Sequence, residues 1–173
     1  MKTFFIADTH FNHTKIIDYC NRPFSNTEEM DKQLIDNWNN AVSKNDIVYH
    51  LGDFALGNVE VIRKYREQLN GKIFLVQGNH DGYSMKRYYE AGFDKVYDKP
   101  IIYQEFYILS HQPLFITENI PYVNIFGHVH NNPEYIDYTS NTFCVSCERI
   151  NYKPILIDNI VDKIQNYKLD KGE

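Results

Sequence analysis

Residues 73–81 read Ile73-Phe74-Leu75-Val76-Gln77-Gly78-Asn79-His80-Asp81. The run Ile73–Gln77 has the length and apolar composition of a buried β-strand. The glycine that ends it is followed by an amide, an imidazole and a carboxylate. The stretch therefore predicts a strand that presents metal-binding side chains at its carboxyl end.

The same arrangement recurs along the chain. Four further apolar runs of similar length are Thr3–Ala7, Ile47–Leu51, Phe106–Leu109 and Val123–Phe126. Groups that can bind metals follow each of them, namely Asp8-Thr9-His10, Gly52-Asp53, Ser110-His111 and Gly127-His128-Val129-His130. Because α/β sheets bind ligands outside the carboxyl ends of their strands, we expect these side chains to share one crevice. One such residue alone is more often a turn or hydrogen-bonding residue, but the five segments hold five of the seven histidines, which favours a common site.

Helical patterns lie between the early strands and near the end of the chain. Apolar residues recur every four positions from Met30 to Val42, and Ser25 with Glu28 fits a capping box ahead of them. Further helices are expected at Val59–Leu69, closed by a cap at Asn70-Gly71, at Ser84–Ala91 before Gly92, and at Asp158–Tyr167. Strands alternate with helices in the first half, and the second half is richer in strands. This order predicts an α/β (α+β mixed) fold with two packed sheets flanked by helices.

The bulk properties are those of a soluble globular protein. The 173 residues, without repeats or linkers, predict a single domain spanning residues 1–173. Residues 1–8 carry too short an apolar stretch for a secretory signal, and no run reaches the ~20 apolar residues that cross a bilayer, so a cytoplasmic protein without a membrane partner is expected. The net charge of −5 argues against a dedicated DNA- or RNA-binding module. A nucleotide-sized substrate stays compatible with this charge, because bound metal ions would dominate the local potential.

The three cysteines, Cys20, Cys144 and Cys147, do not form the pattern of a disulfide framework. Cys144-Val-Ser-Cys147 is a C-x-x-C pair, but it has no second pair and lies in the expected strand Thr142–Cys147. We therefore interpret it as structural rather than as a zinc or redox motif.

In chain order, the polar segments from Asp8 to His130 match the motif set of the calcineurin-like metallophosphoesterases, a family that this chain resembles. The stretch Asp8-Thr-His-Phe-Asn-His13, with Arg22-Pro-Phe24 and the tail Asn151-Tyr-Lys-Pro154, is similar to a small single-domain prokaryotic and phage branch. The resemblance implies a four-layer sandwich of two mixed β-sheets flanked by helices. It also implies a hydrolase for phosphate esters.

The resemblance assigns a role to each motif residue. One divalent cation would take Asp8, His10 and His130, and a second would take Asn79, His111 and His128. Asp53 would bridge the two. A metal-bridging hydroxide would attack the phosphorus, with His80 as general acid and Asp81 orienting it.

The chemistry explains why such residues are needed. Two cations about 3.5–4 Å apart activate water and neutralise the charge that grows on the phosphoryl oxygens. Holding two like charges that close requires a shared anion, here Asp53. The mixed nitrogen and oxygen donors favour manganese or iron, with zinc, cobalt or nickel as alternatives, over calcium or magnesium.

Four residues outside the motifs are less determined. His13 and Arg22, in the loop after the first strand, are candidates for contacting substrate phosphate, with a solvated surface role as the alternative. His50 is expected to be a packed histidine or one that supports a ligand. Arg149 is expected at the surface near the mouth of the site.

The resemblance implies a small phosphate ester or nucleotide as substrate, with phosphodiesters slightly favoured over monoesters and nucleic-acid ends also compatible. The alternative is a catalytically silent binding or scaffold protein on the same fold, which the intact His80 and ligand positions disfavour. A metallo-β-lactamase type is excluded because Asn131-Asn132-Pro133 follows His128-Val-His130, where that class requires Asp-His. The sequence leaves the oligomeric state open, and a dimer is compatible with it.

Overall fold

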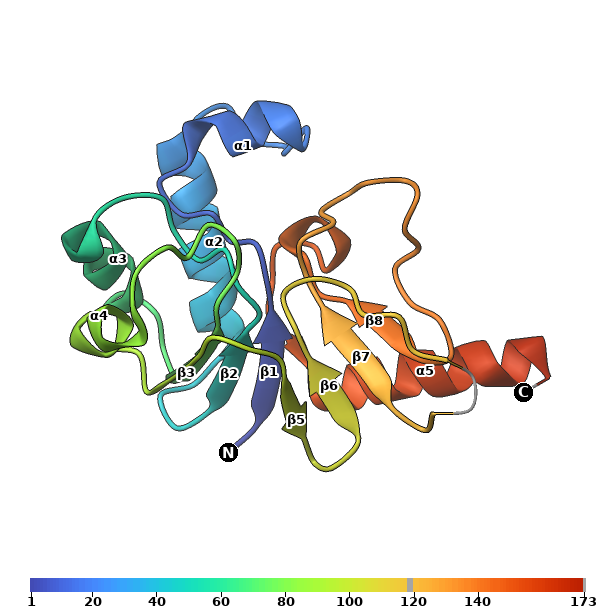
Figure 1. The fold of residues 1–173 in the computed structure, drawn as a ribbon. Helices are drawn as coiled ribbons and strands as arrows, with labels where there is room; N and C mark the ends of the chain where they lie inside the picture. Colours follow the sequence, from blue (N-terminus) through green and yellow to red (C-terminus); the bar gives the residue numbers. More distant parts are fainter. Residues whose placement is uncertain (118–119, 173) are drawn as a thin grey trace.

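The computed structural model describes residues 1–117 and 120–172 and contains two mixed β-sheets (Figure 1). The first has the order β4-β3-β2-β1-β9, with β1 Thr3–Ile6, β2 Ile47–His50, β3 Lys72–Val76, β4 Lys95–Tyr97 and β9 Ile155–Leu156. The second has the order β5-β6-β7-β8, with β5 Ile101–Tyr103, β6 Tyr107–Leu109, β7 Val123–Phe126 and β8 Thr142–Cys144. Only β9 and β5 run antiparallel to their neighbours within these sheets. The remaining strands of each sheet therefore end at one common edge.

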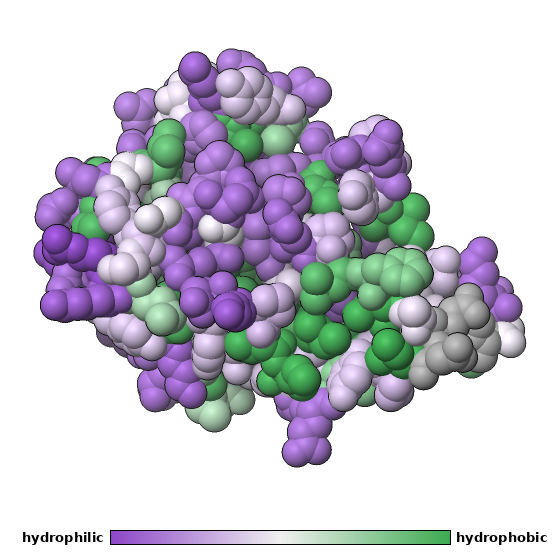
Figure 2. Space-filling view, viewed as in Figure 1, coloured by the Kyte–Doolittle hydropathy of each residue, from purple (hydrophilic) through white to green (hydrophobic). Residues whose placement is uncertain are grey.

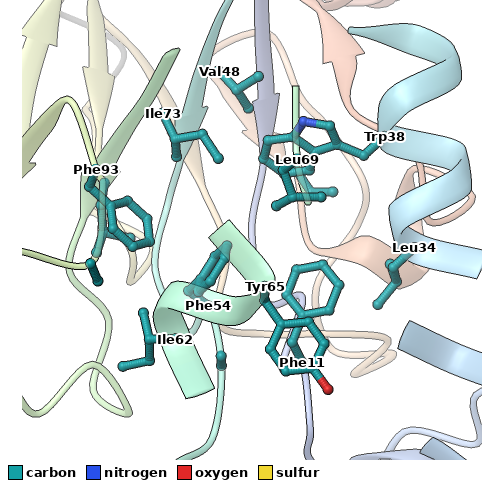
Figure 3. Close-up of a cluster of buried hydrophobic side chains, with 14 of the residues drawn as sticks. Phe11, Leu34, Trp38, Val48, Phe54, Ile62, Tyr65, Leu69, Ile73 and Phe93 are labelled. Carbon is teal, nitrogen blue, oxygen red and sulfur yellow. The ribbon is translucent and has the colours of Figure 1, made fainter. Parts of the chain in front are cut away.

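Four helices share one buried cluster with the first sheet, and the first of them lies above the carboxyl ends of the strands instead of over the face of the sheet (Figure 1). They are α1 Thr14–Tyr19, α2 Thr27–Ala41, α3 Val59–Arg66 and α4 Met85–Glu90. Side chains of α2 and α3, such as Trp38 and Ile62, pack with Val48 and Ile73 of the sheet in one buried cluster (Figure 3). This buried layer holds one face of the first sheet against the helices.

A second buried cluster lies between the two sheets. Successive side chains of a strand point to opposite faces, so Phe4 packs under the helices while Phe5 packs toward the second sheet. There Phe5 meets Ile125 and Phe143, together with Ile160 of the helix α5 (Ile157–Lys171). Burial on both faces explains why these strands read as continuous apolar runs rather than alternating ones. The predicted α/β fold of two mixed sheets flanked by helices is confirmed.

The far side of the second sheet is more exposed. Ile102 of β5 is 59% exposed, and Phe115, in the segment after β6, is 91% exposed. Figure 2 shows hydrophobic atoms gathered on this side of the molecule, over the region of β6 and β7. Among residues 1–117 and 120–172, no helix has both the length and the apolar character needed to span a membrane.

Two predicted helix caps are wrong. The α2 helix is capped by Asn26, whose side chain accepts a hydrogen bond from Glu29 N at 2.9 Å, so the capping pair lies one residue beyond Ser25 and Glu28. The α3 helix ends at Arg66 instead of Leu69, and Asn70-Gly71 lies beyond it. Trp38 Nε1 donates to Asn70 O at 2.9 Å, so a tertiary contact with α2 holds this residue.

The predicted strand Thr142–Cys147 is shorter than expected. It ends at Cys144, and Cys147 begins a short 3-10 helix, η1, over Cys147–Arg149. Both cysteines are buried free thiols. Cys147 Sγ donates to Ala7 O at 3.2 Å, which ties this turn to the end of β1.

Candidate metal centre

The carboxyl ends of five strands bring together the residues that the sequence pattern singled out. Asp8 and His10 follow β1, Asp53 follows β2, Asn79 follows β3, His111 follows β6, and His128 and His130 follow β7. Main-chain hydrogen bonds from Asp8 N to Gly52 O (2.9 Å) and from His10 N to Asp53 O (3.0 Å) join the first two segments. The hydrogen bonding between β1 and β2 therefore continues into the loops that carry these side chains.

Asp53 lies at the middle of this group. Its Oδ2 atom is 3.5 Å from His10 Nε2 and 3.5 Å from His111 Nε2. Its Oδ1 atom accepts a hydrogen bond from His80 N at 2.9 Å, and the side chain is only 2% exposed. One carboxylate therefore stands between two imidazoles that come from different sheets.

The first cluster of donor atoms belongs to Asp8, His10 and His130, which lie within 4.8 Å of one another. Within the described residues, Asp8 Oδ1 and His10 Nε2 are buried without a hydrogen-bond partner. Burial raises the pKa of Asp8 to about 6, although the nearby histidines act in the opposite direction. Buried unpaired groups are rare in proteins, and a bound cation would satisfy both atoms.

The second cluster belongs to Asp53, His111 and His128, again within 4.8 Å of one another. His111 Nε2 is 2.8 Å from Asn79 Oδ1 and 3.1 Å from His128 Nδ1. His111 Nδ1 lies 2.8 Å from Leu51 O, a contact that directs Nε2 toward the cluster. An amide oxygen, two imidazoles and a carboxylate thus converge on one point.

The backbone at these positions is strained. Five of the clustered residues have left-handed φ angles, namely Asp8 (58°), His10 (48°), Asp53 (59°), His128 (71°) and His130 (48°). Such angles are uncommon outside glycine and are retained mainly where surrounding contacts enforce them, often at functional sites. Together with the unpaired donors and the mixed nitrogen and oxygen chemistry, they indicate that the residues present fit divalent metal ions.

His80 and Asp81 follow Asn79 in the chain but lie in different environments. His80 is exposed, and its ring centre lies 5.3 Å from that of His10. The buried Asp81 carboxylate accepts hydrogen bonds from Asp53 N (2.7 Å), Gly78 N (2.8 Å) and Phe54 N (3.2 Å). Asp81 therefore holds the main chain around Asp53, which differs from the predicted role of orienting the His80 ring.

A hollow of about 290 Å³ opens beside the clusters, and His13 lines it. Its other polar lining residues are His10, Cys20, Asp53, Asn79, His80, His128 and His130, with Tyr19 on its wall. His13 is half-buried, and its Nδ1 lies 3.4 Å from His10 Nδ1. This position is compatible with the substrate contact predicted for His13.

Arg22 lies neither in the hollow nor on the surface. Its side chain is fully buried and donates to Asp8 O (2.7 Å), Thr9 O (3.0 Å) and Glu148 Oε1 (2.8 Å from Nη2). A guanidinium committed to these acceptors is a support of the site, so the predicted substrate contact and the solvated alternative are both corrected.

Glu148 belongs to the site, although the sequence pattern did not predict it. Its side chain is 4% exposed, and Oε1 lies 3.0 Å from His130 Nδ1. Burial would raise the pKa of this carboxyl, but the hydrogen bond with His130 and the charge of Arg22 lower it below its ordinary value. The sequence did contain a signal for Glu148, because this polar residue directly follows the expected strand Thr142–Cys147, as the other site residues follow theirs.

His50 and Arg149 support the site from outside. His50 is completely buried, and its Nε2 lies 2.9 Å from Thr9 Oγ1, so the packed histidine expected here is confirmed. Arg149 donates to His130 O, to Asn132 O at 2.7 Å and to Asp137 Oδ1 at 2.6 Å. It fixes the loop that carries His130.

Gly78 provides a test of how tightly the centre is packed. A Cβ atom at this position would clash with Asp53 Oδ1 and lie 2.7 Å from Asp53 N. We expect Gly78→Ala to lower the free energy of unfolding by about 1–3 kcal/mol and to weaken metal binding, because the Asp53 segment must move. Gly82→Ala in the same loop is the control, since its Cβ would meet nothing within 4 Å. Equal thermal stability and metal content in the two variants would contradict this packing argument.

The comparisons with known proteins agree with this geometry. The family model described as calcineurin-like phosphoesterase matches residues 1–156. Uncharacterized protein MJ1445 of Methanocaldococcus jannaschii is 44% identical over 176 residues, which cover 97% of this chain and 94% of that protein. Gene 66 protein of Mycobacterium phage L5 is 31% identical over 83 residues, 46% of this chain and 40% of the phage protein.

A solved structure is also similar. The crystal structure of AQ665 from Aquifex aeolicus, a protein of unknown function, superposes with a TM-score of 0.70 at 30% identity, covering 94% of this chain and 98% of the other. The family match spans all the clustered residues, and the family suggests a metal-dependent phosphoesterase. The chain is therefore a member of the calcineurin-like phosphoesterase family.

Proposed function

We propose that this protein hydrolyses phosphate esters with the help of two divalent cations and acts on phosphodiesters in preference to monoesters. The observation that supports it most is the position of Asp53 Oδ2, 3.5 Å from an imidazole nitrogen of each donor cluster. A carboxylate placed between two separate clusters is what a pair of like-charged ions requires.

In this proposal Asp8, His10 and His130 would hold the first cation, and Asn79, His111 and His128 would hold the second. Asp53 is shared between them. When bound, the cations lower the pKa of water and neutralise charge on the phosphoryl oxygens. The mixed donors suit manganese or iron first, and zinc, cobalt or nickel next.

His80 is the proposed general acid. Its side chain is exposed and lines the hollow, and its ring centre lies 5.3 Å from that of His10. The imidazole can therefore reach a leaving oxygen of the substrate without serving as a metal ligand. His13, on the same wall, can donate a hydrogen bond to a non-bridging phosphoryl oxygen. The chain thus supplies two imidazoles that line the hollow and can act as proton donors.

The preference for diesters rests on the shape and exposure of the site. The hollow is open, and Tyr19, which lines it, is 69% exposed, so a substituent on either side of the phosphorus can extend into solvent. Small diesters, cyclic nucleotides and nucleic-acid ends fit this description.

The test is a hydrolysis screen with controlled metal content. Purified protein is stripped with a chelator, reloaded with Mn²⁺, Fe²⁺ or Zn²⁺, and assayed on bis(p-nitrophenyl) phosphate, p-nitrophenyl phosphate and cyclic nucleotides. We expect metal-dependent turnover, faster with the diester than with the monoester, and binding of two cations per chain. Inactivity with every metal and ester would favour a scaffold protein instead.

A further inference from the structure

A buried ion pair lies directly behind the first donor cluster. Arg22 Nε and Nη2 are 2.9 and 2.8 Å from Glu148 Oε1, and the two side chains are 0% and 4% exposed. The residues are 126 positions apart in the chain. Burying two charges costs several kcal/mol for each ion, so such a pair is weak evidence for stability and calls for another explanation.

The pair contacts both segments that supply the first cluster. Arg22 donates to the main-chain oxygens of Asp8 (2.7 Å) and Thr9 (3.0 Å), which flank the turn that leads to His10. Asp8 and His10 have left-handed φ angles, so this turn needs external support. Arg22 provides it through its hydrogen bonds to the main chain.

Glu148 contacts the remaining member of the cluster. Its Oε1 atom lies 3.0 Å from His130 Nδ1. A proton held on Nδ1 by the carboxylate leaves the lone pair of Nε2 as the one available to a cation. A carboxylate behind a ligating histidine commonly fixes its ring and its tautomer in this way.

The second cluster has different supports. His111 Nδ1 lies against Leu51 O at 2.8 Å, and Asp81 accepts hydrogen bonds from Asp53 N and Gly78 N. The pair therefore contacts Asp8 and His130 of the first cluster directly. It reaches the second cluster only through Asp8, whose Oδ2 atom accepts a hydrogen bond from His128 N at 2.8 Å.

From this asymmetry we infer that Arg22 and Glu148 are positioning residues that set the affinity of the first cation site, made by Asp8, His10 and His130, without setting that of the second. The inference rests on the proposed function, because it presupposes two cation sites.

Glu148→Gln is the sharpest single change. The amide keeps the size of the side chain and can still accept from Arg22, but it removes the negative charge behind His130. We expect calorimetric titration of the metal-free variant with Mn²⁺ to show one site of unchanged affinity and one weakened by about 10–100-fold. Electron paramagnetic resonance should show the loss of the coupled Mn²⁺ pair at limiting metal. Asp94→Asn, in the distant Arg66–Asp94 ion pair (3.2 Å), is the matched control and should bind both ions like the wild type.

A double variant separates positioning from stability. Arg22→Met combined with Glu148→Leu removes both charges together, so no unpaired charge stays buried. We expect it to unfold cooperatively and to retain the second site while the first is weakened by at least as much as in Glu148→Gln. Wild-type affinity at both sites in either variant would overturn the inference, as would equal weakening of the two sites. If the wild type itself binds fewer than two cations, the proposed function fails instead.

Discussion

Asp53→Asn is expected to reduce kcat/KM by about 10³-fold or more and to leave at most one cation bound per chain. The reason is electrostatic. Asp53 Oδ2 lies 3.5 Å from a nitrogen of each donor cluster, and a neutral amide there cannot offset the repulsion between two dications. Metal content by mass spectrometry and steady-state kinetics on a diester measure the two effects.

Asp46→Asn is the matched control for this change. Asp46 is also a buried carboxylate, and it accepts a hydrogen bond from Lys2 N at 2.7 Å beside the opposite end of the same strand, β2. Its loss should lower stability but leave two cations bound. If Asp53→Asn retained both cations and normal turnover, the shared position of Asp53 would be refuted.

His80→Ala is expected to lower kcat by about 10²–10⁴-fold while metal content stays close to that of the wild type. The His80 side chain is exposed, and the group that contacts Asp53 is the backbone N–H of His80, at 2.9 Å from Oδ1. Alanine keeps that N–H, so the position of Asp53 should be retained. Kinetics and metal analysis of the same preparation check both statements.

The leaving group distinguishes a general acid from a merely structural histidine. An alkyl leaving group needs a proton, whereas p-nitrophenolate departs readily without one. The loss in His80→Ala should therefore be large for an alkyl ester and smaller for a p-nitrophenyl ester. An equal loss for both esters, or a loss of bound metal, would count against the role of His80.

Much of the fold was predictable because its signals are local. The predicted strand Thr3–Ala7 extends one residue beyond β1, and the predicted strand Val123–Phe126 coincides with β7. The failures were also local. The cap of α2 at Asn26 instead of Ser25, and the end of α3 at Arg66, depend on which of several neighbouring polar groups finds a partner.

The supports of the site show a different limit. Arg22 resembled a substrate ligand and Asp81 a partner of His80, because their place beside motif residues was the only information available. Their actual partners, Glu148 in one case and Asp53 N in the other, are 126 and 28 positions away. Pairing over such separations follows from the packing of whole elements.

The sequence by itself determined which donor atoms the protein has and that each follows a strand, since strand formation and the position after a strand are readable from neighbouring residues. Only the tertiary structure decided that Asp53 Oδ2 stands between His10 and His111, and that Arg22 and Glu148 meet behind His130. The physical reason is that these distances are set by how the two sheets pack through Phe5, Ile125 and Phe143, which are contacts between residues far apart in the chain.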